Sequence, residues 1–301
     1  MNKKTRHQPV LLQESLMWLN IQQDDIVVDA TLGGGGHARA IAEHLKERGV
    51  LLGIDTDSAA IVRAREALVG VKAQVILTQA NFRELEAILK EHELKTVHKV
   101  LFDLGWSSDQ LEASGRGFTF SRDEPLLMTL SDAPEKGTLT AEYIVNEWSE
   151  ESIADALYGW GEERFARRIA KAIVLARSEK PIRTTGELAA IVKEAVPAAY
   201  RAGKRHPATK TFQALRIAVN DEIGALTEGL TSAIAHLTKG GRVAAISFHS
   251  IEDRTVKQLF RNAKADGAGN ILTKKPVVPT RVEVQQNPRA RSAKLRVFQK
   301  A

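Results

Sequence analysis

Acidic residues and a run of glycines are the part of this sequence whose types and spacing point to chemistry. Asp29 is followed by four consecutive glycines, Gly33 to Gly36, and Asp55 comes about 20 residues after that turn. A glycine-rich turn between a strand and a helix leaves backbone N–H groups and the positive helix end open to an anionic group. An acid at this distance can bind ribose hydroxyls. The pattern predicts a nucleotide-like ligand. Because the glycines do not match G-x-G-x-x-G cleanly, a dinucleotide is disfavoured and an adenosyl cofactor stays open.

The elements that must position these residues alternate along the first third of the chain. Apolar stretches predict strands over residues 26–28, 50–54, 74–78 and 99–104, with helical patterns between them. Strands joined by helices form a parallel sheet, whose ligand crevice lies at the carboxyl ends of the strands. Asp29, Asp55 and Asp103 all stand at such ends. We therefore expect the three aspartates to surround one crevice.

The alternation stops after residue 104. Residues 105–134 are rich in Gly, Ser, Asp and Pro and predict a long loop, and helices are expected near 140–148, 149–157, 161–178 and 184–197. From Thr209 an amphipathic pattern predicts one long helix that Gly240 and Gly241 end. A fifth strand over 242–248, a helix over 251–261 and a last strand over 295–299 follow. The sequence thus predicts an α/β protein in which a mainly helical domain, residues 111–207, is inserted into a sheet domain of residues 1–110 and 208–301.

Composition narrows the class of protein. With 301 residues and 43% hydrophobic content the chain can bury a large core. The sequence shows no run of about 18 apolar residues and no leader-like segment. We therefore expect neither a membrane span nor a secretion signal. A cytoplasmic enzyme is the default expectation. The absence of cysteine excludes disulfides, thiolate metal sites, iron–sulfur clusters and a cysteine nucleophile, and no metal site is predicted.

Charge is segregated along the chain. The formal net charge is +6, yet residues 116–160 hold three basic and nine acidic side chains, residues 161–216 hold 13 and five, and residues 274–301 hold eight and one. Arg164, Arg168 and Lys171 fall on one face of an expected helix. Separated basic segments are typical of a surface that binds a polyanion, so a nucleic acid is the expected partner. The alternative is an ordinary solvated face.

Longer stretches resemble a known family. They are Asp29-Ala-Thr-Leu-Gly-Gly-Gly-Gly-His37, Asp103-Leu-Gly-Trp-Ser-Ser108 with Gln110-Leu111, Arg116-Gly-Phe-Thr-Phe120, Gly161-Glu-Glu-Arg-Phe165, His206 to Arg216, Ser247-Phe-His-Ser-Ile-Glu-Asp-Arg254 and Asn287-Pro-Arg-Ala-Arg-Ser292. In this order they resemble the RsmH family, also called MraW, of bacterial ribosomal RNA small-subunit methyltransferases. The resemblance implies a Rossmann-like class I methyltransferase sheet and S-adenosylmethionine as the cofactor. It further implies methylation of the N4 amine of a cytidine in the decoding region of 16S ribosomal RNA, as naked RNA or in the small ribosomal subunit. The oligomeric state stays open, a dimer included.

The resemblance also implies cofactor contacts. The positions that match those of the family are Gly35, Gly36, His37, Asp55, Phe82, Asp103 and Gln110. The N–H groups of the glycine turn would receive the methionine carboxylate. Asp55 would bind the ribose hydroxyls, Phe82 one face of the adenine, and Asp103 the cationic part of the cofactor. Plainer alternatives are a packing role at a helix start for His37 and an ordinary core position for Phe82.

The missing cysteine restricts the methyl acceptor. Methylation of a pyrimidine carbon ordinarily uses a cysteine, and methylation of an unactivated carbon uses a radical iron–sulfur cluster. An exocyclic amine, a ribose hydroxyl or a protein group therefore remains. An amine needs an acceptor for its proton, and the candidates are Asp103, Ser107, Ser108 and His249. For His249 a structural role at the end of the fifth strand is an equal alternative.

Six basic residues are the expected contacts to RNA phosphates: Arg164, Lys204, Arg205, Lys210, Arg289 and Arg291. The sequence departs from the family at two nearby stretches. The usual Gly-Val-Ser-Ser-Pro-Gln reads Gly105-Trp-Ser-Ser-Asp-Gln110, and the usual Leu-Asp-Met-Arg-Met-Asp reads Leu126-Leu-Met-Thr-Leu-Ser131. The loss of two acids and an arginine near a substrate loop keeps a non-catalytic RNA-binding ribosome assembly factor as the alternative function. A nicotinamide-dependent oxidoreductase and a DNA amino-methyltransferase rank behind it.

Overall fold

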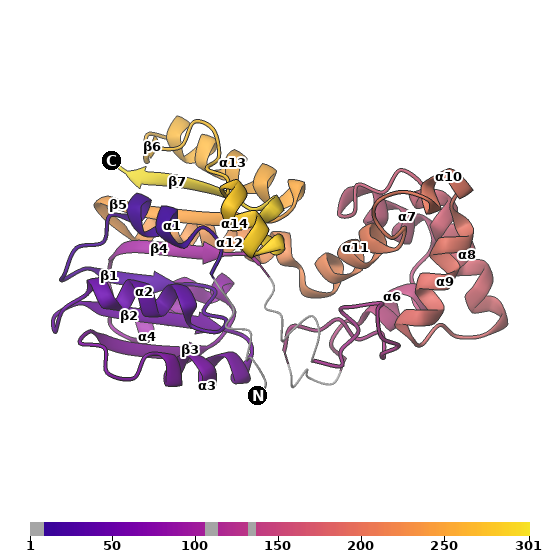
Figure 1. Cartoon of the computed structure of the whole chain (residues 1–301), viewed down its shortest axis with the longest axis horizontal. Coiled ribbons are helices and arrows are strands. Elements are labelled where there is room, and N and C mark those ends of the chain that lie inside the picture. Colours follow the sequence, from indigo (N-terminus) through magenta and orange to yellow (C-terminus); the bar gives the residue numbers. More distant parts are fainter. Residues whose placement is uncertain (1–8, 106–113, 132–136) are drawn as a thin grey trace. The chain divides into compact units, whose positions relative to one another are not determined.

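The computed structural model describes residues 9–105, 114–131 and 137–301. The chain forms two compact units, Met1–Ser107 with Ile223–Ala301, and Ser108–Glu222. In Figure 1 the first unit is a sheet flanked by helices and the second is a group of helices. The expected α/β class, a Rossmann-like sheet with a mainly helical insertion, is confirmed.

The first unit is built on one seven-stranded sheet in the order β3-β2-β1-β4-β5-β7-β6. The strands are β1 (Ile26–Asp29), β2 (Val50–Asp55), β3 (Gln74–Gln79), β4 (Val97–Asp103), β5 (Leu237–Ser247), β6 (Gly269–Ile271) and β7 (Lys294–Lys300). Strands β1 to β5 are parallel, and β7 is antiparallel to both β5 and β6. The strand order reverses between β1 and β4, the point at which sheets of this kind bind ligands.

Helices cover both faces of this sheet. The helices α1 (Leu12–Leu19), α2 (Gly36–His44) and α3 (Ser58–Ala67) contribute to one apolar core, and α4 (Leu85–Glu91), α12 (Glu222–His236) and α13 (Ser250–Ala265) contribute to the other. Successive strand residues alternate between the two cores, as Val27 and Val28 of β1 do. Since both faces of a strand are buried, its residues are apolar without a break, which is why the apolar stretches predicted these strands.

The second unit is helical over most of its described residues. Its helices are α6 (Ala141–Glu147), α7 (Glu150–Gly159), α8 (Ala166–Glu179), α9 (Thr185–Ala195), α10 (Ala198–Arg201) and α11 (Thr209–Asn220). Thr140, Ser149 and Thr184 each accept a backbone N–H group in the first turn of α6, α7 and α9. Helix α8 begins later than the predicted residue 161, because Glu162 has a positive φ of 50° and the buried Glu163 accepts the Phe165 N–H group at 2.9 Å.

The prediction of one long helix from Thr209 to Gly240 is wrong. Helix α11 ends at Asn220, Asp221 adopts the left-handed conformation with φ 45°, and α12 ends at His236. The Asn220 side chain accepts the Leu130 N–H group and donates to the Met128 carbonyl oxygen, so the end of α11 is tied to the preceding loop. The apolar periodicity continues across the break because both helices keep an apolar face.

Several short elements of the first unit were not predicted. They are α1, β6, the 3-10 turn η1 (Phe82–Glu84), α14 (Arg281–Gln286) and the 3-10 turn η2 (Pro288–Ser292). Strand β5 also begins five positions earlier than the predicted residue 242, at Leu237. Across the described ranges, no helix combines the length and the apolar character that crossing a membrane requires.

Candidate active site

The carboxyl ends of β1, β2 and β4 bring the three aspartates together. Asp29 pairs in the sheet with Gly53 of β2 on one side and with Leu101 of β4 on the other. Asp55 and Asp103 end those two neighbouring strands, and the charge of each acts on Asp29. The three carboxyl groups thus stand at the ends of neighbouring strands, as expected, and that they surround one ligand crevice stays a prediction.

The glycine turn leads from β1 into α2. Gly33 and Gly35 have positive φ values of 52° and 76°, which glycine adopts without strain. A Cβ atom on Gly36 would lie 2.5 Å from Cγ of Pro9, so the position of Pro9 requires glycine at residue 36 as well. Gly35 directly precedes α2 at the N-cap position and offers no side chain to cap it, which leaves the first N–H groups of the helix open to an anionic ligand.

Asp55 holds the other side of this turn. Its Oδ2 accepts the Gly33 N–H group at 2.8 Å, and its Oδ1 accepts the Asp57 N–H group at 2.9 Å. Burial raises the pKa of Asp55, although both N–H groups act to lower it. Each carboxylate oxygen has a second lone pair. Asp55 is therefore equipped to accept hydrogen bonds from two ribose hydroxyls while it holds the turn.

His37, the second residue of α2, is buried between two hydrogen-bond acceptors. Its Nε2 lies 3.1 Å from the carbonyl oxygen of Val10, and its Nδ1 lies 3.4 Å from Oδ2 of Asp103. When Asp103 is ionised neither partner can donate, so both ring nitrogens carry a proton and the ring is a cation. Burial acts to lower the pKa of His37, but the hydrogen bond to Asp103 and the charges of Asp103 and Asp29 outweigh it and raise the pKa.

Asp29 is fully buried beside this pair. Its Oδ1 accepts the Thr31 N–H group at 3.2 Å. Burial raises the pKa of Asp29 to about 6, against the lowering effects of His37 and of that N–H group. Among the described residues, Oδ2 of Asp29 and Oδ1 of Asp103 have no hydrogen-bond partner. Two buried carboxylate oxygens without partners are costly, and a bound cationic group would relieve that cost.

Phe82 lies in η1, at the margin of the second core. Its ring meets Phe102 of β4 edge to face, with centroids 5.5 Å apart and planes at 89°. Helix α12 makes room for it with Gly229, where a Cβ atom would lie 2.7 Å from Cδ2 of Phe82. The side chain is half-buried, so Phe82 packs against the core and keeps accessible surface.

The described residues fit the S-adenosylmethionine that the resemblance implies. The open N–H groups at the start of α2 suit a carboxylate. The unpaired oxygens of Asp29 and Asp103 suit an ammonium or sulfonium charge. Sequence reasoning did not find the part that Pro9 and Val10 take in this site, because Val10 acts through a backbone carbonyl that any residue would supply.

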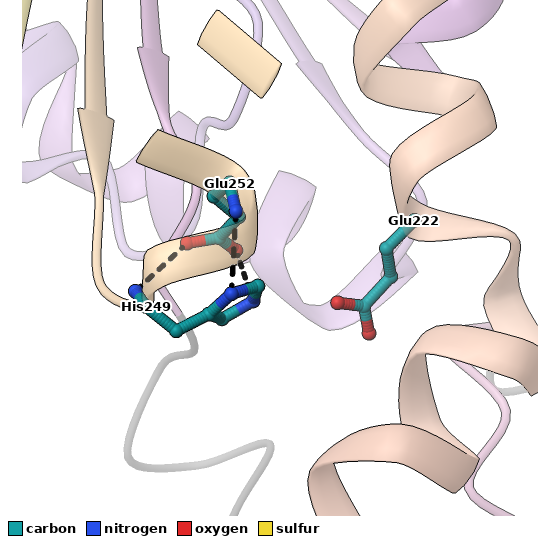
Figure 2. Close-up of side chains that lie close together, drawn as sticks. All are labelled: Glu222, His249 and Glu252. Carbon is teal, nitrogen blue, oxygen red and sulfur yellow. Dashed lines mark hydrogen bonds and ion pairs between the residues drawn. The ribbon is translucent and has the colours of Figure 1, made fainter. Parts of the chain in front are cut away.

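His249, a candidate proton acceptor, begins α13 together with Glu252 (Figure 2). Its Nδ1 accepts the Glu252 N–H group at 3.3 Å, and its Nε2 lies 3.0 Å from Oε1 of Glu252. Oε2 of Glu252 in turn accepts the Phe248 N–H group at 2.8 Å. Nε2 then carries the proton of the neutral ring, and its contact with Glu252 does not have hydrogen-bond geometry. Because the Nδ1 lone pair is already engaged, the neutral ring has no lone pair left for a substrate proton. Glu222, also labelled in Figure 2, pairs with Arg216 within the helical unit.

The predicted RNA contacts occupy both units. Arg164, Lys204 and Arg205 are exposed on the helical unit, and Arg289 and Arg291 are exposed on η2 of the sheet unit. Lys210 is half-buried, and its Nζ donates to the carbonyl oxygen of Glu162 at 2.6 Å. Lys210 therefore already holds the turn before α8.

Some predicted site residues lie outside the described ranges: Ser107, Ser108 and Gln110, together with the departures at Trp106 and Asp109. The second departure is described. Where the family carries two acids and an arginine, this chain has Leu127, Thr129 and Ser131. Thr129 is buried and its hydroxyl donates to the carbonyl oxygen of Ser131 at 3.2 Å. The segment therefore packs in the helical unit with neutral side chains in place of charges.

Comparison with known proteins decides the family. A model described as the MraW methylase family matches residues 4–301. The chain belongs to the MraW methylase family. Proteins named ribosomal RNA small subunit methyltransferase H from Brevibacillus brevis and Paenibacillus sp. are each 45% identical to this MraW family member. A protein of the same name from Acetivibrio thermocellus is 43% identical. Each match covers 98% of this chain, and 98%, 99% and 99% of the three relatives in that order. The family resemblance drawn from the motifs is confirmed.

Proposed function

We propose that this MraW family member transfers a methyl group from S-adenosylmethionine to the N4 amine of a cytidine in the decoding region of 16S ribosomal RNA. The observation that carries the proposal is the pair of unpartnered, buried carboxylate oxygens of Asp29 and Asp103 beside an uncapped glycine turn. The names of the relatives, which are ribosomal RNA small subunit methyltransferases, support the RNA substrate. Because bacterial ribosomes assemble in the cytoplasm, the proposed substrate places the enzyme there.

The residues of the site bind and orient. The N–H groups of Gly36 and His37, at the start of α2, hold the carboxylate of the cofactor, Asp55 holds its ribose and Phe82 lies against its adenine. Gly35 shapes the turn, and its own N–H group donates to the Leu32 carbonyl oxygen at 2.9 Å. Gln110 adds the remaining contact that the family resemblance implies. S-adenosylmethionine supplies an electrophilic methyl group on a sulfonium, so the enzyme mainly aligns nitrogen, carbon and sulfur. Such orientation supplies up to roughly 7–11 kcal/mol of the barrier.

The proton acceptor is proposed among Asp103, Ser107, Ser108 and His249. The contacts of the described candidates favour Asp103. Its Oδ1 is free of partners among the described residues, and its Oδ2 faces the His37 cation. In His249, by contrast, the one lone pair of the neutral ring, on Nδ1, already accepts the Glu252 N–H group. An acceptor on the N4–H bond localises the amine lone pair and then removes the proton.

The helical insertion, residues 111–207, is proposed to recognise the RNA, and residues 1–110 with 208–301 to form the methyltransferase domain. Arg164, Lys204 and Arg205 are exposed and suited to bind phosphates, as are Arg289 and Arg291. Lys210 would have to give up its bond to the Glu162 carbonyl oxygen.

A labelled methyl-transfer assay tests this function. Small ribosomal subunits and naked 16S RNA from a strain lacking the corresponding gene are incubated with the enzyme and methyl-labelled S-adenosylmethionine. Digestion to nucleosides and mass spectrometry should give N4-methylcytidine. A labelled ribose or another base would contradict the N4 assignment. Cofactor binding without any transfer would favour the alternative, a non-catalytic assembly factor.

A further inference from the structure

His206 forms an exposed aromatic stack with Phe120 on the helical unit. The ring centroids lie 4.5 Å apart with planes at 28°, an offset face-to-face arrangement. Phe212 of α11 supports Phe120 edge to face at 5.0 Å and is itself buried. His206 is exposed and Phe120 is half-buried. The stack therefore rises in one column from the apolar interior to the surface.

The imidazole of His206 is fixed as a neutral ring. Its Nδ1 accepts the Ala208 N–H group at 3.2 Å, which requires an unprotonated Nδ1. Burial, together with the charge of Lys193, lowers the pKa of His206 and favours the same neutral form. The His206 carbonyl oxygen accepts the Thr209 N–H and hydroxyl groups at the start of α11, at 3.1 and 2.8 Å. The ring is held in place before any ligand arrives.

The segment that carries this ring is basic. Arg201, Lys204 and Arg205 are exposed and precede His206 directly in the chain. Just before them, Tyr200 lies under the guanidinium of Arg164, which is 4.8 Å from the Tyr200 ring centroid and 4.7 Å from that of Phe165. Aromatic rings among cationic side chains are the combination with which proteins bind single-stranded nucleic acids.

We propose that His206, seated on Phe120, is a stacking platform for an unpaired base of single-stranded RNA, with Lys204 and Arg205 holding the adjoining phosphates. The proposal rests on the proposed RNA substrate and adds a base contact to it. Stacking accepts any base, since every base has a π face. The platform thus holds RNA that is single-stranded where it meets the enzyme, as an unpaired loop or end does.

The alternative role for His206 is structural, as a helix-capping residue. The two roles predict that different His206 variants lose RNA binding. His206→Asn keeps an oxygen acceptor for the Ala208 N–H group and removes the ring, whereas His206→Phe keeps a ring and removes the acceptor. Binding of a short single-stranded RNA containing a fluorescent adenine analogue is measured by anisotropy, and stacking by quenching of its emission. Thermal unfolding is measured in parallel.

We expect H206N to unfold like the wild-type chain, to bind about 5- to 150-fold more weakly and to lose the quenching. Its salt dependence should stay unchanged because the ring is neutral. H206F should unfold at a lower temperature yet bind within about threefold of wild type. Arg205→Gln should instead flatten the slope of log affinity against log salt by about 0.7 for its phosphate.

Two results would overturn the platform: H206N binding as tightly as wild type, or wild-type enzyme binding no single-stranded RNA. Weakened binding in H206F together with wild-type binding in H206N would assign the residue to helix capping alone. The methyl-transfer assay with wild-type enzyme separates these results from a failure of the proposed function. Transfer to ribosomal RNA that persists in H206N with unchanged affinity leaves the function standing and removes only the base contact.

Discussion

Nδ1 of His37 lies 3.4 Å from Oδ2 of Asp103, so a residue of the glycine turn and the end of β4 form a buried ion pair. The other ring nitrogen reaches the Val10 carbonyl oxygen just before α1. One side chain thus joins three parts of the chain that are distant in sequence. This histidine therefore places a positive charge beside Asp29 and Asp103.

Removal of the His37 cation should destabilise the enzyme. His37→Phe leaves Asp103 and Asp29 without their shared positive neighbour, and breaking a buried pair in this way costs about 3–5 kcal/mol. The free energy of unfolding from urea titration checks this. His44→Gln is the matched control, because His44 lies on the same helix, is exposed and contacts the Ala40 carbonyl oxygen of its own helix. It should change stability by less than about 0.5 kcal/mol; similar losses in both variants would contradict the ion-pair account.

Two glycines of the turn should respond differently to a methyl group. In Gly36→Ala the new Cβ would meet Cγ of Pro9 at 2.5 Å, whereas nothing lies within 4 Å of a Cβ on Gly34. We expect G36A to lose about 1–3 kcal/mol of stability and to bind S-adenosylhomocysteine at least tenfold more weakly in calorimetry. G34A should be close to wild type in both measurements. Tight cofactor binding by G36A would contradict this prediction, because it would show that Pro9 can move to make room for the new Cβ atom.

The raised pKa of Asp29 predicts a stability that falls with increasing pH. The folded state keeps the Asp29 proton up to about pH 6, whereas the unfolded chain releases it near the ordinary value of 3.8. Between these values the unfolded chain binds fewer protons, so the free energy of unfolding declines, by about 3 kcal/mol in total. Asp29→Asn should lack this decline and be more stable than wild type at neutral pH without ligand. It should gain less stabilisation from S-adenosylmethionine.

Asp253 serves as a control, because its pKa is shifted in the opposite direction to that of Asp29. Burial acts to raise its pKa, but hydrogen bonds from Arg296 and Lys294 outweigh burial and lower the pKa below its ordinary value. Its contribution to stability is present above pH 3.8 and is lost as the pH falls through the lowered pKa. Asp253→Asn should therefore be less stable than wild type at neutral pH, with the difference vanishing in acid. Equal pH profiles for D29N and D253N would contradict both assignments.

Kinetics should distinguish the candidate proton acceptors. Asp103→Asn removes the free carboxylate oxygen, and loss of a general base lowers kcat about 10²- to 10⁴-fold. His249→Asn keeps an acceptor for the Glu252 N–H group and should hold kcat within about threefold if His249 only caps α13. Single-turnover methyl transfer at saturating cofactor checks both. A greater loss in H249N than in D103N would reverse the preference.

Local patterns predicted the parts of the fold that depend on local chemistry. Val100, Leu101 and Phe102 are apolar because β4 is buried on both faces, and Thr184 with Glu187 marked the start of α9. The break at Asp221 escaped prediction because it depends on tertiary contacts of Asn220. The residues of the candidate site likewise divide into those that local patterns predict and those that depend on tertiary contacts. The aspartates were found as strand ends, whereas the charge of His37 depends on a carbonyl oxygen 27 residues away.

Strand β7 is the last strand in the chain, yet it lies between β5 and β6. Its Val297 and Phe298 enter the two cores on opposite faces of the sheet. While a ribosome is still adding residues, at roughly 5–20 per second, β5 presents a bare apolar edge to any neighbouring nascent polypeptide. We therefore expect a chain that terminates shortly before this strand to aggregate and not to form a smaller working enzyme.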